Sequence, residues 1–278
     1  MIQRIADASH PVLAPYRHVG DPAALERRGL FVAEGRFVVE RLIAARPRFS
    51  IESIVVTPAA AAALAELLDR AGDIAVIVCE PPLLERITGF DFHRGCLALA
   101  RRPSATPLTS FARARRLLAL ERVGNPDNVG GLFRVALALG GDGVLLDPAS
   151  GDPLYRKAIR TSMGAALRVP FARVEPWPAG LDEVRGDAQV VALTPDPAAM
   201  PIDEYAVEPD RRLILLLGSE GPGLSDAAMR YADVRLRIPV APAADSLNVV
   251  VAAGIALHML MRGFRLPLSR EALRRDPP

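Results

Sequence analysis

The stretch "LLLGSEGPGLSD", residues 215–226, decides how the rest of the sequence is interpreted. Counting Ile214, four aliphatic residues run into a glycine-rich turn, which is the pattern of a buried parallel strand that ends at a ligand. Glycine-rich turns of this kind often hold a phosphate through their backbone N–H groups. Here Glu220 carries a negative charge at the centre of the turn, and Pro222 has no N–H to donate. The turn is therefore a poor phosphate site, and its ligand has to be inferred from other segments.

Common nucleotide-binding and nucleophile motifs are absent from the sequence. The only lysine, Lys157, lies in "LYRKAIR" and not in a glycine loop, so no Walker phosphate loop is present. Neither "GNPDNVGG" (124–131) nor "GSEGPG" (218–223) has the G-x-G-x-x-G spacing of a dinucleotide fold. There is no G-x-S-x-G elbow, and the four histidines have no acidic partner at motif spacing. Nucleotide folds and triad hydrolases are therefore poor matches.

The composition is that of a globular protein of up to two domains. The 278 residues are 50% hydrophobic and 24% charged, and the net charge of +2 excludes a histone-like polycation. Apart from Lys157, every lysine or arginine position is an arginine, which suits bidentate contact with phosphate. The abundance of alanine, proline and arginine is also what a GC-rich genome produces, and this explanation carries the greater weight.

The two cysteines indicate a reducing compartment. Cys79 and Cys96 have neither metal-ligand spacing nor the pattern of a disulfide framework, so we expect two small buried side chains and no metal site. The N-terminus lacks an apolar run of signal-peptide length, and no apolar stretch approaches the roughly 20 residues that span a bilayer. We therefore expect a cytoplasmic protein with no membrane segment.

Residues 1–103 read as a small α/β domain followed by a linker at 104–116. The proline- and arginine-containing stretch "RRPSATPLTSFARARR" (101–116) marks the boundary. Apolar periodicity and breaker residues predict the following elements: a helix over 31–45, a strand over 51–58, a helix over 60–72, a strand and a short helix within 74–89, and a strand over 93–102.

Residues 117–266 alternate strands with helices, and residues 267–278 form a basic tail. The strands "RLLALE", "GVLLD", "VVALTP", "RLILLLGSE" and "VRLRIPV" are nearly continuous aliphatic runs. Long apolar segments lie between or after them, among them "SLNVVVAAGIALHMLMRGF" (246–264). This alternation predicts a parallel sheet with helices on both faces.

Three segments of this second domain carry a family resemblance. They are "ERVGNPDNVGGLFRVALALGGDGVLL" (121–146), "LILLLGSEGPGLSD" (213–226) and "LRIPVAPAADSLNVVVAAGIALHML" (236–260). In order and wording they resemble the three motifs of the SpoU/TrmH branch of the SPOUT RNA methyltransferases. The stretches "FVAEGRFVVERLI" and "ITGFDFHRGCLALARR" look like the N-terminal substrate-binding domain of that family. Val240 and Val250 depart from the family pattern, where methionine and serine are common, and both are changes on the scale of packing.

The resemblance implies an α/β architecture: a C-terminal parallel-sheet trefoil-knot (SPOUT) domain preceded by a small α/β RNA-binding domain. The cofactor it implies is S-adenosylmethionine (AdoMet), bound largely by main-chain groups, so that Pro222 does no harm. Threading a knot would bring backbones close together, which favours glycine at 218, 221 and 223 because glycine has no Cβ. The implied cofactor-binding positions are Leu193, Thr194, Gly218, Ser219, Gly221, Ile238 and Leu247.

The same resemblance implies methylation of a ribose 2′-hydroxyl of rRNA or tRNA, and it assigns the catalytic residues. We expect Arg134 to hold the adjacent phosphate or to stabilise the developing alkoxide, because a guanidinium resists deprotonation. Asn128 is expected to be both a helix N-cap and a site residue, and Glu220 to orient Arg134 or the ribose. Ser246 is the expected N-cap of the last helix. Asn248, beyond that cap, is expected to hydrogen-bond to the substrate.

RNA and a second copy of the chain are the expected partners. Positions expected to contact RNA phosphates are Arg94, Arg101, Arg102, Arg156, Lys157 and Arg160. The apolar last helix around Ala252, Ile255 and Met259 predicts a homodimer. Two alternatives stay open at this point: an RNA-binding or ribosome-assembly factor without catalysis, and methylation of a base as in other SPOUT branches.

Overall fold

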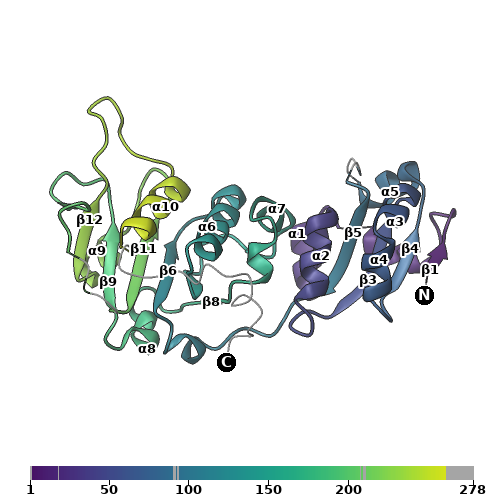
Figure 1. Ribbon diagram of the computed structural model, residues 1–278, viewed down its shortest axis with the longest axis horizontal. Coiled ribbons are helices and arrows are strands. Elements are labelled where there is room, and N and C mark those ends of the chain that lie inside the picture. The colour runs from purple at the N-terminus through teal and green to yellow at the C-terminus, as the bar shows by residue number, and fades with distance from the viewer. Residues whose placement is uncertain are drawn as a thin grey trace. The chain divides into compact units, whose positions relative to one another are not determined.

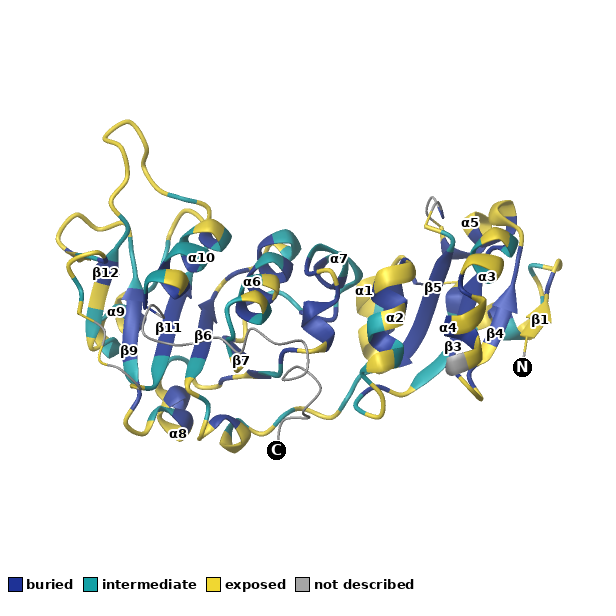
Figure 2. Cartoon of the chain, in the orientation of Figure 1, coloured by how far each residue is buried: buried dark blue, intermediate teal, exposed yellow. Residues whose placement is uncertain are grey.

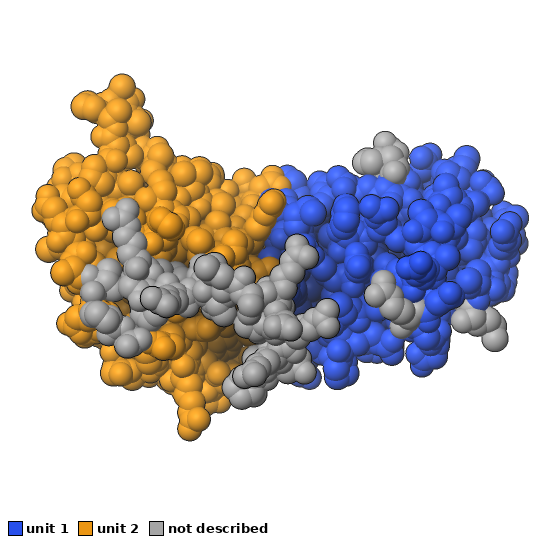
Figure 3. Space-filling view, in the orientation of Figure 1, with its two compact units in different colours: residues 1–105, 152–168 blue, residues 106–151, 169–278 orange. Residues whose placement is uncertain are grey.

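The computed structural model describes residues 2–17, 19–89, 92, 94–206, 208 and 211–260. They form two compact units. One comprises the residues up to 105 together with 152–168, and the other comprises 106–151 and the described residues from 169 onward (Figures 1 and 3). The segment 152–168, which the sequence placed in the second domain, thus belongs to the N-terminal unit. The expected tail, 267–278, lies outside the described residues.

The N-terminal unit is built on a five-stranded mixed sheet. The strand order is β1 (Ile2–Arg4), β4 (Ala75–Val78), β3 (Ile51–Val56), β5 (Cys96–Arg101) and β2 (Leu30–Glu34). Strand β5 is antiparallel to both β3 and β2, whereas β1, β3 and β4 are parallel. The helical elements are η1 (Pro11–Tyr16), α1 (Pro22–Arg27), α2 (Arg36–Ala44), α3 (Pro58–Ala63), α4 (Ala65–Arg70) and α5 (Pro81–Thr88).

Two of the predicted helices of this unit differ from the structure. The first part of the helix expected over 31–45 is strand β2, whose five residues are all buried. A strand that is buried on both faces of a sheet lacks the alternation of apolar and polar residues that normally identifies a strand. The helix predicted from apolar periodicity was therefore wrong over these residues. Gly35, with φ of +93°, makes the turn from strand to helix α2. The helix expected over 60–72 is divided at Leu64 into α3 and α4.

Helix α7 (Arg156–Thr161) and η3 (Ala165–Leu167) complete the N-terminal unit because α7 packs on strand β2. Ala158 and Ile159 are fully buried in that packing. Nearby, the guanidinium of Arg102 forms an ion pair with Asp152. This contact explains why 152–168 groups with a sheet that lies far from it in the sequence.

The C-terminal unit is an entirely parallel seven-stranded sheet. Its order is β10 (Met200–Pro201), β12 (Val234–Arg237), β9 (Gln189–Leu193), β11 (Leu213–Gly218), β6 (Arg116–Glu121), β7 (Gly143–Leu146) and β8 (Phe171–Arg173). The central strands are buried, as Figure 2 shows. The predicted parallel α/β fold is confirmed, and the strands β8 and β10 were not predicted.

Helices cover both faces of this sheet. Ile214 and Leu216 of β11 point into a core shared with η2 (Leu108–Phe111), η4 (Ala179–Leu181), α8 (Asp182–Arg185) and α9 (Asp226–Tyr231). Helices α6 (Pro126–Ala138) and α10 (Val249–Leu260) pack against each other, α6 on β7 and α10 on β11. Because Phe111 is buried in the first of these cores, the expected linker 104–116 is largely part of the C-terminal unit.

Candidate active site

A pocket of about 640 Å³ opens where three neighbouring strands end. Its walls come from the segments that follow β9, β11 and β12, which are adjacent in the sheet and parallel. Parallel strands present their carboxyl ends at one edge, and ligands of α/β proteins bind at that edge. The volume lies in the range of pockets that enclose a small molecule or cofactor.

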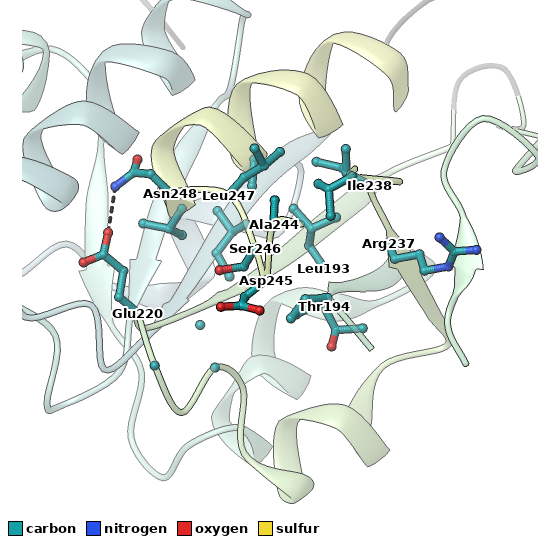
Figure 4. Close-up of a pocket in the computed structure, with 18 of the residues that line it drawn as sticks. Leu193, Thr194, Glu220, Arg237, Ile238, Ala244, Asp245, Ser246, Leu247 and Asn248 are labelled. Carbon is teal, nitrogen blue, oxygen red and sulfur yellow. Dashed lines mark hydrogen bonds between the residues drawn. The ribbon is translucent and has the colours of Figure 1, made fainter. Parts of the chain in front are cut away.

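All seven positions expected to bind the cofactor line this pocket: Leu193, Thr194, Gly218, Ser219, Gly221, Ile238 and Leu247. Figure 4 shows the apolar side chains of Leu193, Ile238 and Leu247 gathered on one side. Glu220, Ser246 and Asn248 line it as well. Sequence reasoning missed Arg237 and Asp245, which are also lining residues. The signal for both was their charge on either side of the largely apolar, proline-containing stretch that follows β12.

The glycine turn after β11 is held closed by its own backbone. Ser219 and Gly223 form an isolated bridge, and Gly223 N–H donates to the Ser219 carbonyl at 3.2 Å. A Cβ on Gly218 would lie 2.3 Å from the carbonyl carbon of Gly223, which leaves no room for any side chain. At Gly221 and Gly223 a Cβ would meet nothing within 4 Å, but φ is +87° and +66°. Close approach thus explains only Gly218, and positive φ explains the other two.

Two residues at the end of β6 brace this turn and were missed in the sequence. Glu121 is 4% exposed, and its Oε2 accepts a hydrogen bond from Ser225 N–H at 2.7 Å. The Arg122 guanidinium donates to the Gly223 carbonyl at 3.3 Å. Arg122 adopts a φ of 54°, which its N–H bond to buried Asp147 at 3.0 Å helps to maintain. The sequence signal that could have identified Glu121 was its position, as a charged residue, at the end of an aliphatic strand.

Asn248 caps helix α10 and joins two motifs. Its Oδ1 accepts a hydrogen bond from Val250 N–H at 2.9 Å, and its carbonyl accepts from Ala252 N–H. This is the N-cap arrangement, so the cap is Asn248 and not the expected Ser246. The amide Nδ2 donates to Glu220 Oε1 at 2.7 Å (Figure 4) and to Asn128 Oδ1 at 3.0 Å. Both Nδ2 protons are therefore engaged within the protein, which argues against a direct substrate bond from that group.

Asn128 lies inside helix α6 and not at its cap. The N-cap is Asn125, whose side chain accepts from Asp127 N–H at 2.9 Å, whereas Asn128 is 7% exposed in the first turn. Its contact with Asn248 depends on close packing of α6 and α10. A Cβ on Gly131 would lie 2.7 Å from the Val250 side chain, so glycine at that position lets the two helices approach.

Arg134 is separated from this group of side chains. It is exposed on α6 and is not among the residues that line the pocket. Six residues of helix turn it by more than one and a half turns from Asn128, onto another face. Within the part of the chain that the structure describes, no hydrogen bond or ion pair involves its side chain. One copy of the chain therefore brings together Asn128, Asn248 and Glu220 but leaves Arg134 apart.

The six basic positions expected to contact RNA all lie in the N-terminal unit. Arg101 pairs with Glu52 at 2.5 Å, and Arg102 pairs with Asp152 while its Nε donates to the Leu30 carbonyl at 3.1 Å. Both side chains have partners within the sheet. Their role in RNA binding stays a prediction.

Three of the other four basic residues lie around one buried carboxylate, and the fourth shares a helix with two of them. Arg94, Arg156 and Arg160 surround Glu34, with nitrogen–oxygen distances of 3.9, 3.0 and 3.9 Å. Lys157 is partly exposed on the same helix as Arg156 and Arg160.

The thiols are buried, as expected. Burial raises the pKa of Cys79, and it raises the pKa of Cys96 to about 11. Among the described residues no group of three or more His, Cys, Asp or Glu side chains is arranged to hold a metal ion. In that same part of the chain no helix is long and apolar enough to cross a membrane.

Comparison with known proteins gives the family. The model of the SpoU rRNA methylase family matches residues 115–258. An uncharacterized tRNA/rRNA methyltransferase of Mycobacterium bovis is 37% identical over 266 residues, which cover 92% of this chain and 91% of that protein.

Two solved structures share the fold. The AdoMet-bound rRNA methyltransferase from Sinorhizobium meliloti has a TM-score of 0.80 at 24% identity, covering 95% of this chain and 99% of that one. The SpoU methyltransferase AviRb from Streptomyces viridochromogenes has a TM-score of 0.78 at 23% identity, covering 91% and 97%. Because the family model spans more than half of the chain and the mycobacterial relative matches almost all of it, the chain belongs to the SpoU rRNA methylase family.

Proposed function

We propose that this protein transfers a methyl group from AdoMet to a ribose 2′-hydroxyl of an rRNA or a tRNA. Family membership carries the coarser statement, that the chain is an RNA methyltransferase that uses AdoMet. The pocket at the ends of β9, β11 and β12 supports the use of AdoMet, because it is lined by every position that the motifs assign to the cofactor. The ribose assignment is supported by the motif residues Asn128, Glu220 and Asn248, which are hydrogen-bonded to one another beside that pocket.

The pocket has the chemistry that AdoMet requires. Its apolar side, Leu193, Ile238 and Leu247, suits a flat adenine ring, and its size suits the whole cofactor. The carboxylates of Glu220 and Asp245 suit the positive sulfonium and amino groups. Ser219 Oγ is buried and has no hydrogen-bond partner in the described part of the chain. A polar group of the ligand could supply the missing hydrogen bond after a small shift of the turn. When bound, AdoMet supplies an activated methyl group.

The protein's share of the reaction is then positioning and electrostatics. A ribose hydroxyl is a weak nucleophile, so it has to be aligned with the methyl group and helped to lose its proton. Glu220 lies at the rim of the pocket, where Asn248 fixes one of its carboxylate oxygens and Asn128 fixes Asn248. We assign Glu220 to orienting the ribose, and the two asparagines to holding Glu220 in place.

Arg134 has the properties of a residue that completes a site in a second subunit. It is exposed, it carries a guanidinium group, and it does not line the pocket of its own chain. We propose that the chain forms a homodimer in which Arg134 holds a substrate phosphate or stabilises the developing alkoxide. Val251, 51% exposed on α10, supports this arrangement because it leaves an apolar side chain uncovered on that helix. The trefoil knot expected from the resemblance is part of the same proposal.

The test is the chemical identity of the methylated product. The purified protein is incubated with methyl-labelled AdoMet and bulk rRNA or tRNA, and the RNA is hydrolysed in alkali. A 2′-O-methyl group blocks cleavage at its own phosphodiester, so the label should appear in alkali-resistant dinucleotides. Label in mononucleotides would indicate a methylated base, and absence of label with intact RNA binding would favour a non-catalytic RNA-binding or assembly factor.

A further inference from the structure

Arg122, the first residue after strand β6, has a backbone conformation that is costly for any residue with a side chain. Its φ is 54°, in the left-handed region that residues with a Cβ rarely adopt. Ten described glycines have a positive φ, whereas only two other described residues do, Arg122 and Met163. Strained residues of this kind cluster at functional sites. The arginine at this position therefore has to be explained by what its side chain does.

The backbone around Arg122 is held by the turn that follows strand β7. Arg122 N–H donates to Asp147 Oδ1 at 3.0 Å, and Val123 N–H donates to Ser150 Oγ at 3.1 Å. Gly151 N–H donates in return to the Val123 carbonyl at 2.9 Å. Asp147 and Ser150 are both buried. None of these bonds uses the Arg122 side chain, so glycine at this position would keep the same conformation with less strain.

The Arg122 side chain contacts the glycine turn after β11. Its Nη2 donates to the Gly223 carbonyl at 3.3 Å, and within the described part of the chain its guanidinium group makes no other hydrogen bond or ion pair. Gly223 is also the residue whose N–H closes the turn on the Ser219 carbonyl. Arg122 does not line the pocket, but five residues of the turn do. Any effect of Arg122 on a bound cofactor therefore passes through the turn.

We propose that Arg122 is a positioning residue for AdoMet. Its guanidinium group holds the glycine turn in the shape that accepts the cofactor, and the chain tolerates the strained φ for the sake of this contact. A turn without this hydrogen bond adopts other shapes for part of the time, and the apparent affinity falls with the fraction of molecules that can bind. The inference rests on the proposed function in taking the pocket for the AdoMet site. It goes further in naming a residue outside the pocket that sets the affinity.

Three substitutions separate the side chain from the backbone strain. Arg122→Gly removes both, Arg122→Ala removes the side chain but keeps the strain, and Arg122→Lys keeps a donor on a flexible stem. In calorimetric titration of the full-length protein, we expect the glycine and alanine variants to bind AdoMet about fivefold more weakly than wild type, as for the loss of one exposed hydrogen bond. The lysine variant should recover part of that loss.

Thermal unfolding in the absence of AdoMet gives the readout that a merely structural role would not produce. Glycine adopts a φ of 54° without strain, so Arg122→Gly should have a Tm no lower than wild type and about 2–4 °C above that of Arg122→Ala. Weaker cofactor binding would then occur in a protein that is not destabilised. In the methyl-transfer assay, saturating AdoMet should restore wild-type kcat to Arg122→Gly, because the substitution acts on cofactor binding.

Met163→Gly is the matched control. Met163 has nearly the same φ, 53°, but it lies after helix α7 in the N-terminal unit. The substitution relieves a similar strain without touching the glycine turn, so AdoMet affinity should stay within about twofold of wild type.

Two results would overturn the inference: wild-type AdoMet affinity in Arg122→Gly and Arg122→Ala, or an equal loss of affinity in Met163→Gly. Unchanged AdoMet affinity with a raised KM for RNA would place Arg122 on the substrate instead. Failure of the proposed function looks different. Wild-type protein would then bind AdoMet but leave no label in alkali-resistant dinucleotides, and the AdoMet affinities of the Arg122 and Met163 variants would still decide the role of Arg122.

Discussion

Gly218→Ala is the substitution whose consequence the geometry defines best. The added Cβ would lie 2.3 Å from Gly223 C, 2.4 Å from Leu224 N and 2.7 Å from Gly223 O. All three are backbone atoms, so no side-chain rotation can relieve the contact. Ordinary van der Waals separation begins near 3.4 Å, which means that the backbone of the turn has to move by about 1 Å.

That movement breaks the contacts that close the turn. Overpacking of this kind costs about 1–3 kcal/mol. The hydrogen bonds from Gly223 N–H to the Ser219 carbonyl and from Ser225 N–H to Glu121 would weaken or break, at about 1 kcal/mol each. A destabilisation of about 2–5 kcal/mol corresponds to a fall in Tm of roughly 5–15 °C. Because five residues of the turn line the pocket, AdoMet affinity should also fall by about tenfold or more.

The assay is thermal unfolding by circular dichroism together with calorimetric titration of AdoMet. Gly124→Ala is the matched control: it lies in the turn after β6, its φ is not positive, and a Cβ there meets nothing within 4 Å. We expect that variant to keep wild-type Tm and AdoMet affinity. If Gly218→Ala behaves like Gly124→Ala, the backbone contact does not set the shape of the turn, and the account of the pocket is wrong.

Four further outcomes are expected. Arg134→Ala abolishes methyl transfer while AdoMet affinity stays within about threefold of wild type, since Arg134 does not line the pocket; equal loss of both would make it a folding residue. The protein sediments as a homodimer at micromolar concentration, and Val251→Arg on exposed α10 shifts it to monomer; a wild-type monomer would contradict this. A fragment that starts near Ser110 should have a lower Tm than the full-length protein, because Ala158 and Ile159 of α7 lose the β2 surface that buries them. An unchanged Tm would count against the assignment of 152–168 to the N-terminal unit. Neither thiol reacts with Ellman's reagent at pH 8 in the native state, because both cysteines are buried and the Cys96 pKa is raised to about 11; rapid labelling of the folded protein would contradict their burial.

The sequence predicted the C-terminal sheet well because its strands are continuous aliphatic runs, which are typical of parallel strands buried on both faces. Leu213–Gly218 and Arg116–Glu121 form the strands expected of them, and both lie at the centre of the parallel sheet. The same property misled at 31–34, where full burial gave no alternation and the strand was taken for the start of a helix. Local pattern also gave no sign that α7 packs on β2, since that contact joins segments more than 100 residues apart.

Within the site, the motifs identified the pocket-lining residues but not their individual roles. Asn248 and Ser246 are two residues apart at a helix start, and only the hydrogen bond from Val250 N–H shows that Asn248 is the cap. Asn128 likewise gives way to Asn125 as the cap of α6. Glu121 was missed because its partner, Ser225, is more than 100 residues away. Hydrogen bonds between distant segments are a property of the tertiary fold, and a single sequence does not display them.

Nucleoside mapping of cellular RNA tests the central claim most directly. Ribosomal and transfer RNA from a strain that lacks this protein is compared, by mass spectrometry of nuclease fragments, with RNA from the strain complemented by wild-type protein or by Gly218→Ala. We predict that one 2′-O-methylated nucleotide disappears on deletion, returns with the wild-type protein and stays absent or strongly reduced with Gly218→Ala. Loss of a base methylation, or no change in any methylated nucleotide, would contradict the assignment of this chain as a ribose 2′-O-methyltransferase.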